Sequence, residues 1–429
     1  MRRKYRLGRI APALLAVVVV AAVAVVSATA ATRHRATTTL TIWTWNVNQQ
    51  KVGDATFLHN NPGVQLNYVN IASKDLYPKM ELAASSRSGL PDVVLLEDSH
   101  LRQIAKLGVL EDITSFAKPY TSKFVAAKWQ QNTLNGKIYG FPWDIGPVAL
   151  YYRRDLFQKA GIKPASLTTW AKWLSAGKKI KAKTGAYLWE QSKAQNDARF
   201  YEDLLWQQGS GYVDDRGHVS IDKDPRALAA LNLIGQGWQD NLFANDAEWT
   251  DAWYKAIDSG QIATLPMAAW MGGFMESWLA PNGKGKWGVV PLPAFTPGGS
   301  TSANDGGSDL AVTTSANKAV AIAYIKNLLA TPFVQAQVWK ASGFFPSMYS
   351  ATRTPFTKAP DPYFGGQPVQ ELFAAEAKTI PKAHVYSPDY QEMNSIMSAE
   401  IQKFGLHQES AQQALKNAAA QIRTKTGRH

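Results

Sequence analysis

The sequence predicts an α/β fold with mostly parallel sheets, and three observations lead to this prediction. Residues 39–45, TLTIWTW, are rich in β-branched and aromatic side chains, which favour a strand. Residues 90–98, LPDVVLLED, form a short apolar run between turn residues, as in a strand that is buried on both faces. Helical patterns lie between the strands, and this alternation is typical of a parallel sheet covered by helices.

The N-terminal elements follow in a regular order. A second strand is expected at residues 63–71, whose apolar side chains alternate with polar ones. Helices are expected at residues 73–89 and 100–108. The first helix should break near Pro78, because proline lacks the amide hydrogen that a helix interior uses. Gly108 should end the second helix, since glycine readily adopts the left-handed conformation found there.

The rest of the chain continues the same alternation. Residues 286–295 predict an edge strand, because prolines interrupt them. Thr168 or Thr169 is expected to cap one long helix, and Ser410 the last one. Further strands are expected at residues 137–142, 148–153 and 261–270, and the small residues of the stretch 300–312 lead into another. Helices are expected at residues 154–161, 166–185, 198–209, 224–243, 317–330, 331–343, 391–405 and 410–427.

The chain length indicates two domains or lobes, because 429 residues exceed the size of one ordinary core. The sequence contains no internal repeat, no heptad run and no low-complexity linker long enough to separate independent domains. We therefore expect two lobes that are joined by more than one short crossing.

The N-terminus predicts export. Five basic residues precede an apolar run at residues 10–26, and Ala28-Thr29-Ala30 resembles a cleavage site. Residues 1–30 are therefore interpreted as a signal peptide or, alternatively, as an uncleaved membrane anchor, since the run is near the lower limit for a span. Residues 31–38 form a polar tether. The expected location is the periplasm or the outer face of the cytoplasmic membrane.

Composition excludes several classes of function. Cysteine is absent, which excludes disulfides, thiolate metal sites, a cysteine nucleophile and attachment through a lipidated cysteine. Five of the 46 basic residues lie in residues 1–30, so 41 remain against 33 acidic residues. These charges are dispersed and form no basic stripe with aromatic residues, so no nucleic-acid partner is expected.

The search for catalytic motifs gives a negative result. The sequence contains no H-E-x-x-H metal helix, no G-x-S-x-G elbow and no glycine-rich phosphate loop. Residues 214–222, DDRGHVSID, resemble a calcium loop only superficially, because Arg216 takes a ligand position and the final glutamate is missing. No catalytic residue, metal or cofactor is predicted.

Aromatic and polar residues cluster at the expected strand ends, where open α/β sheets bind their ligands. Aromatic faces beside carboxylates suit sugars, because the ring stacks on C–H groups and the carboxylates accept from hydroxyls. Packing in the core is the alternative for each tryptophan taken singly, and Trp43 is expected to be core. The candidates are Trp45, Asn46, Glu97, Asp98, Ser99, Trp143, Asp144 and Trp270.

The chain after the signal resembles the carbohydrate-type family 1 extracellular solute-binding proteins of ABC importers, whose best-known members are the maltose-binding proteins. The resemblance covers residues 38–425 and rests on several stretches in the order and spacing of the family. They are NNPGVQLNYV, SGLPDVVLLE, LGVLEDIT, NGKIYGFPWDIGPVALYYRRDLFQKAGI, LTTWAKW, KWGVVPLP, GGSDLAV and SAQQALKNAAAQI.

The resemblance implies a two-lobed type II periplasmic-binding-protein-like fold, with hinged lobes around an interlobe cleft. It implies an N-lobe of residues 39–128 and 308–350, and a C-lobe of residues 129–307 and 351–429. It also implies a monomer that delivers a sugar to an ABC importer permease. Ala268 and Ala269 depart from the Gly-x-Trp that often carries the stacking residue. By position in the family, the resemblance adds further residues to the site: Gln49, Tyr151, Gly306, Gly307, Ser308, Phe345 and Tyr390.

Two alternatives remain open from the sequence. The same fold could bind another solute, such as a polyamine, an amino acid or a metal chelate, if carboxylates dominated the cleft with cation–π support. A secreted glycan-active enzyme would need two carboxylates at glycosidase separation, and Asp98 and Asp144 are the pair to compare.

Overall fold

The computed structural model describes residues 37–193, 198–381 and 385–429. The predicted signal or anchor, residues 1–30, lies outside the described residues, as does the predicted tether up to residue 36. In the described part, no single helix is long and apolar enough to cross a membrane. The helices Lys318–Leu329 and Pro332–Ser342 reach such a composition only together, as a pair bent by 67°.

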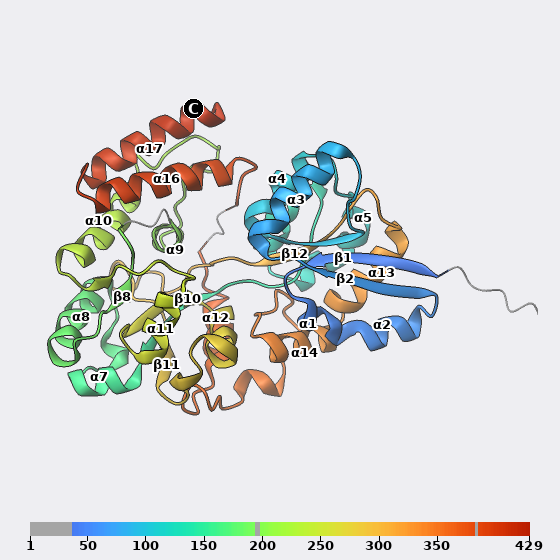
Figure 1. Ribbon diagram of the computed structural model, residues 1–429. Coiled ribbons are helices and arrows are strands. Elements are labelled where there is room, and N and C mark those ends of the chain that lie inside the picture. Colours follow the sequence, from blue (N-terminus) through green and yellow to red (C-terminus); the bar gives the residue numbers. More distant parts are fainter. Residues whose placement is uncertain (1–36, 194–197, 382–384) are drawn as a thin grey trace, which may run out of the picture. The chain divides into compact units, whose positions relative to one another are not determined.

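The first lobe is built on a five-stranded sheet in the order β2-β1-β3-β12-β6 (Figure 1). Strand β1 runs parallel to β2 and β3, whereas β12 runs antiparallel to β3 and β6. These strands are β1 (Thr38–Thr44), β2 (Val64–Asn70), β3 (Val93–Glu97), β6 (Phe141–Pro142) and β12 (Ser308–Val312).

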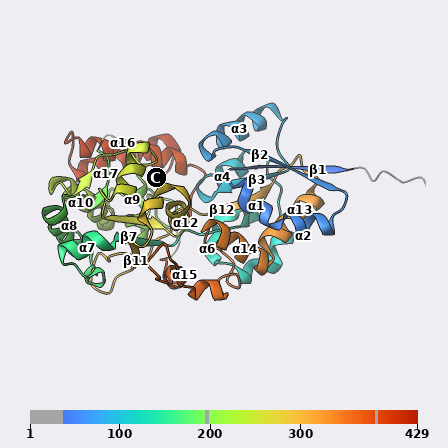
Figure 2. The ribbon, with the colours of Figure 1, turned by 60° about the horizontal axis from the view of Figure 1, so that its bottom comes forward.

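Both faces of this sheet are covered. Leu40 and Ile42 join the core on one face, and Trp43 joins the core on the other, as alternation along a strand requires. Figure 2 shows α3 on one face and α13 on the opposite face. The first face carries α1 (Val47–Gln50), α2 (Asp54–Asn60), α5 (Thr114–Ala117), α6 (Ala126–Asn132), α13 (Lys318–Leu329) and α14 (Pro332–Ser342), and the second carries α3 (Ser73–Ser86) and α4 (Asp98–Lys106).

The predicted break at Pro78 is wrong, because α3 continues through it. Pro78 is preceded by Leu76 and Tyr77 and followed by Met80, and all three are buried against the sheet. Packing on both sides of the proline therefore holds the helix together, although proline removes one hydrogen bond.

The second lobe is built on a three-stranded sheet in the order β10-β7-β11. The prediction of mostly parallel sheets is wrong here, because both neighbours run antiparallel to β7. Every residue of β7 is buried. The composition of such a strand does not distinguish a parallel sheet from an antiparallel one. The predicted edge strand is confirmed as β11. The strands are β7 (Val148–Arg153), β10 (Thr264–Ala268) and β11 (Trp287–Val290); the short pairs are β4 (Thr133–Leu134) with β5 (Lys137–Ile138), near the first sheet, and β8 (Trp189–Glu190) with β9 (Phe243–Ala244).

Helices surround the second sheet and share one large core. The predicted caps are confirmed, since Thr169 accepts a hydrogen bond from the Lys172 amide and Ser410 accepts one from the Gln413 amide. The last two helices pack side by side (Figures 1 and 2). The helices are α7 (Arg154–Ala160), α8 (Trp170–Thr184), α9 (Arg199–Gln207), α10 (Pro225–Gln239), α11 (Asp251–Ser259), α12 (Trp270–Phe274), α15 (Val369–Glu376), α16 (Tyr390–Gly405) and α17 (Ala411–Thr426).

Two short crossings, at residues 143–148 and 303–308, connect the lobes, and the chain passes between the lobes a third time beyond Ala351, which still packs in the first-lobe core. The first two pair through hydrogen bonds from the Val148 amide to the Ala303 carbonyl, 2.9 Å, and from the Asp305 amide to the Gly146 carbonyl, 2.8 Å. Residues 344–347 lie beside the first of them, where the Ile145 amide donates to the Phe345 carbonyl, 2.9 Å. More than one crossing was expected from the sequence.

The first crossing lies later in the chain than predicted. The C-lobe was expected to begin at residue 129, but Trp129, Phe141 and Trp143 pack in a core of the first lobe. β6 also pairs with β12 of the first sheet. The chain therefore leaves the first lobe after β6, because the aromatic residues that precede this point are needed to complete the first core.

Candidate functional site

A cavity of about 720 Å³ lies between the two lobes. We call it the interlobe cavity. The first lobe contributes the segment that follows β1, the start of α3 and the end of β3, and the second lobe contributes α9, α12 and the start of α16. The crossings form its floor through Asp144 and residues 305–308, together with Phe344. The carboxyl ends of β1, β3 and β6 thus meet at one edge, as the strand order requires.

Most predicted site residues line this cavity, although their contact with a ligand stays a prediction. β1 ends at Thr44, so that Trp45 lies one residue past the strand, half-buried and facing the cavity. The predicted residues in the lining are Trp45, Asn46, Glu97, Asp98, Ser99, Asp144, Trp270, Gly306, Gly307, Ser308 and Tyr390.

Four predicted residues lie elsewhere. Trp143 is 2% exposed and packs in the core of the first lobe. Tyr151 lies in the middle of β7 rather than at its end, and its hydroxyl donates to the Ala268 carbonyl, 3.0 Å. Phe345 packs against Trp339 with ring centroids 5.2 Å apart. Gln49, in α1, is half-exposed and does not line the interlobe cavity.

Several residues of the cavity wall were not predicted. Arg199, Glu202 and Trp206 come from one face of α9, where their spacing of three and four residues could have indicated a common surface. Trp249 was not predicted, because it follows no strand that the sequence predicts. The others are Ala72, Ser73, Lys74, Phe274, Asp305, Phe344, Tyr386 and Asn394.

Aromatic rings form the second-lobe wall of the cavity. Trp270 lies near-parallel to Trp249, with centroids 6.0 Å apart, and 5.6 Å from Phe274. The Trp270 indole Nε1 donates to the Asp305 carbonyl, 3.1 Å, which fixes the ring against the second crossing. Phe344 contacts Phe274 edge-on, at 6.1 Å. With Trp45 on the first lobe, aromatic faces border the cavity from both lobes.

A buried ion network lies beneath the first-lobe wall. The Lys128 ammonium contacts the Asp98 carboxylate and lies 3.0 Å from the Asp309 carboxylate. Burial alone would lower the pKa of Lys128, but Asp309, Asp98 and Asp144 outweigh burial and raise it. Lys128 therefore stays charged, and Asp98 is engaged with the protein rather than directed only at the cavity.

Asp144 links the first two crossings through hydrogen bonds to Ser308. Its Oδ1 accepts hydrogen bonds from the Ser308 amide, 2.8 Å, and from the Ser308 hydroxyl, 2.5 Å. Burial raises the pKa of Asp144 to about 6, against the lowering effects of Lys128 and Ser308. Gly307 has φ of +118°, and a Cβ there would lie 2.7 Å from Asp98 Oδ2. The glycine is thus needed for the close backbone approach that its sequence suggested.

Glu202 is held by the second lobe. The Tyr390 hydroxyl donates to Glu202 Oε2, 2.7 Å, and the Asn394 amide donates to Oε1, 2.9 Å. The Tyr212 hydroxyl also donates to Oε1. Tyr390 is therefore at the cavity as the resemblance implied, but its hydroxyl is directed at a carboxylate of its own lobe.

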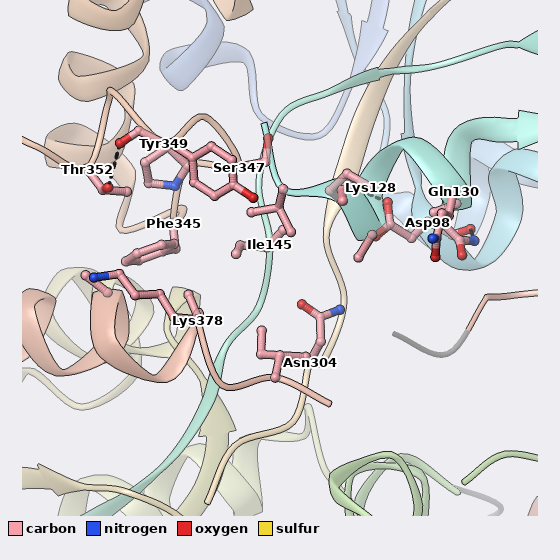
Figure 3. Close-up of a pocket in the computed structure, with 18 of the residues that line it drawn as sticks. Asp98, Lys128, Gln130, Ile145, Asn304, Phe345, Ser347, Tyr349, Thr352 and Lys378 are labelled. Carbon is pink, nitrogen blue, oxygen red and sulfur yellow. Dashed lines mark hydrogen bonds and ion pairs between the residues drawn. The ribbon is translucent and has the colours of Figure 1, made fainter. Parts of the chain in front are cut away.

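A second cavity of about 460 Å³ shares Asp98 and Tyr386 with the interlobe cavity (Figure 3). The crossings supply Ile145 and Asn304 to its wall, and the segment beside them supplies Phe345. Phe345 was predicted for the ligand site and lies here instead. In the described ranges, no group of three or more histidine, aspartate or glutamate side chains is arranged to hold a metal ion.

Two lobes, the crossings that join them and a cavity between the lobes define an α/β binding protein with a hinge. The chain matches the bacterial extracellular solute-binding protein family over residues 47–332, and it belongs to that family. The predicted family and the predicted two-lobed α/β class are thereby confirmed.

Individual relatives agree with this assignment. The chain is 28% identical to a lactose-binding protein of Rhizobium radiobacter over 379 residues, which cover 84% of this chain and 87% of that protein. It is similar to a crystal structure of a family 1 extracellular solute-binding protein, with a TM-score of 0.76 and 28% identity over 90% of this chain and 99% of the other. An ABC-transporter-associated binding protein from B. animalis subsp. lactis Bl-04, in complex with β-1,6-galactobiose, shares the fold with a TM-score of 0.78 and 24% identity, covering 90% of this chain and 97% of that one.

Proposed function

We propose that this chain captures a sugar or oligosaccharide in the interlobe cavity and delivers it to the permease of an ABC importer. One observation carries the proposal: aromatic faces of both lobes, Trp45 and the Trp270 wall, border the same polar-floored cavity. Sugar rings stack their C–H faces on such side chains, while carboxylates and amides accept and donate hydrogen bonds at the ring edges.

Binding in this cavity supplies a signal to the membrane. A ligand that contacts both lobes favours the arrangement in which the lobes lie closest, because only that arrangement makes both sets of contacts. The crossings are the segments that absorb such a change. The permease would then distinguish loaded from empty protein by the relative position of the lobes.

The relatives support a carbohydrate as the ligand. One similar protein is named a lactose-binding protein, and another was solved in complex with β-1,6-galactobiose. Both sugars are disaccharides. The family is extracellular, which agrees with the export predicted from residues 1–30. The absence of cysteine excludes a lipidated cysteine, so we propose a free periplasmic protein or one held by its N-terminal segment.

The rival solutes fit the cavity less well. A diamine needs carboxylates to face it. Of those in the lining, Asp98 contacts Lys128, Asp144 accepts two hydrogen bonds from Ser308, Glu202 accepts from Tyr390 and Asn394, and Asp305 lies 3.6 Å from Arg199, whereas Glu97 is half-exposed. The same engagement argues against Asp98 and Asp144 as an acid and base pair. The chain belongs to a family of solute-binding proteins, so it is not an enzyme.

A thermal-shift panel tests the proposal. The mature chain is heated with lactose, β-1,6-galactobiose, other mono- and oligosaccharides, and putrescine as a diamine. A saturable rise in the melting temperature with a carbohydrate is expected, since a ligand that binds only the folded state stabilises it. A rise with putrescine and none with any carbohydrate would overturn the proposal.

A further inference from the structure

We propose that Trp249 and Trp270 form one stepped stacking surface that selects ligands of two or more sugar rings, with Arg199 and Glu248 as the residues that position Trp249. This inference rests on the proposed function and adds the size class of its ligand. Trp249 is 42% exposed and lines the interlobe cavity, whereas Trp270 is more deeply placed in the same wall.

The backbone at Trp249 is in an unusual conformation. Its φ is +62°, in the left-handed region that bulky side chains rarely adopt. Such conformations persist only where the surroundings impose them, and they gather at binding sites. Trp249 is partly exposed, so burial of its own side chain does not explain the strain. In this conformation the indole lies against Trp270.

A buried ion pair holds the residue that precedes Trp249. Glu248, the preceding residue, accepts two hydrogen bonds from the Arg199 guanidinium, Nε to Oε2 at 3.0 Å and Nη2 to Oε1 at 2.6 Å. Arg199 is anchored on α9 and also bonds Asp203, 2.9 Å. A bidentate ion pair of this kind fixes the orientation of the two side chains as well as their distance. It therefore ties the turn that carries Trp249 to a helix of the cavity wall.

The two indoles present more surface than either one alone. Their planes differ by 29°, and their centroids are 6.0 Å apart, which is further than the distance between two eclipsed rings. The rings are therefore offset, and Trp249 extends the face of Trp270 outward. Fully buried Trp253 supports Trp249 from below, with centroids 5.2 Å apart. A single sugar ring covers about one indole, so the outer ring has room for a second sugar.

Affinity as a function of ligand length tests the selection. We expect Trp249→Ala to weaken binding of the disaccharide and longer homologues by about tenfold, the size of one aromatic contact, and to change binding of the monosaccharide less than about twofold. Trp278→Ala is the matched control, because Trp278 is 48% exposed and does not line the cavity. It should leave affinity unchanged at every length.

Glu248→Gln tests the positioning role with a spectroscopic readout. The circular-dichroism difference between wild type and Trp249→Ala reports the coupling of Trp249 with Trp270 and Trp253. Glu248→Gln keeps the indole but loses the ion pair, so we expect it to lose part of that signal and part of the disaccharide affinity. A loss of affinity with an unchanged indole signal would show that Glu248 does not act through Trp249.

The outcomes separate the two proposals. If no carbohydrate of any length binds, the proposed function fails. If carbohydrates bind but Trp249→Ala weakens all lengths equally or none, only the inference on ligand size is overturned. The melting temperature of each unliganded variant shows that the compared proteins are folded.

Discussion

At the scale of residues, Trp43 and Trp45 show how two neighbouring tryptophans take different roles. Trp43 lies within β1, is 5% exposed and packs against α3 and α4. Trp45 lies just past the strand and borders the interlobe cavity. The end of a strand is thus the point at which an aromatic residue changes from packing to a candidate ligand contact.

This difference predicts opposite effects of truncation. Trp43→Ala should lower the free energy of unfolding by about 3–5 kcal/mol, because it leaves a cavity in the core. Trp45→Ala should lower it by only about 1 kcal/mol and weaken sugar binding by about tenfold. Urea unfolding and calorimetric titration measure the two quantities. If both variants lost stability alone, Trp45 would be a packing residue.

Asp144 predicts a dependence of stability on pH. Its pKa is raised from 3.8 to about 6 by burial, so the folded state holds a proton that the unfolded state has lost between these values. As the pH rises through that window, the contribution of Asp144 lowers the free energy of unfolding by up to about 3 kcal/mol. Asp144→Asn keeps an acceptor for Ser308 and removes the charge.

The comparison of Asp144→Asn with wild type isolates this effect. Urea unfolding at several pH values between 4 and 7 should show a smaller decline of stability in the variant. Equal declines in both proteins would mean that Asp144 stays ionised across the window and that Lys128 outweighs its burial.

At the scale of elements, the crossings depend on close backbone contact. A Cβ at Gly146 would lie 1.7 Å from the Asp305 carbonyl oxygen of the second crossing. The two crossings are hydrogen-bonded at this point, since the Asp305 amide donates to the Gly146 carbonyl. Any side chain at residue 146 must therefore push the crossings apart.

Gly146→Ala should destabilise the fold by about 1–3 kcal/mol or more and weaken ligand binding, because the crossings also set the cavity floor. Gly272→Ala is the matched control, since its added methyl would make ordinary contacts, 3.4 Å from the Phe364 ring. Thermal unfolding and ligand titration of both variants make the comparison. Unchanged affinity in Gly146→Ala would show that the cavity does not depend on the pairing of the crossings.

At the scale of the whole molecule, the sequence predicted what depends on local pattern. The strand ends at Trp45, Asp98 and Trp270 were predictable because each directly follows an apolar run, and the cap at Ser410 was predictable because a hydroxyl residue precedes a helical pattern. The direction of the strands beside β7 was missed, because a buried strand has the same composition in either arrangement. The pairing of Arg199 with Glu248 was missed because it joins segments far apart in the chain.

The lobes are connected by more than the crossings. The side-chain amide of Gln391, in α16, donates to the Ser99 carbonyl of α4, 3.2 Å. The backbone amide of Tyr386 donates to Gln131 Oε1, 2.9 Å. A ligand between Trp45 and Trp270 would add contacts of the same kind, from one lobe to the other. Under the proposed function, binding would therefore be linked to the relative position of the lobes.

Calorimetric titration with the most tightly bound disaccharide, on wild type, Trp270→Ala and Trp278→Ala, tests the central claim most directly. The interlobe cavity predicts saturable binding at one site per chain in wild type and in Trp278→Ala, and affinity at least about tenfold weaker in Trp270→Ala. Equal affinity in Trp270→Ala and wild type would contradict the claim that the sugar binds against the aromatic wall of this cavity.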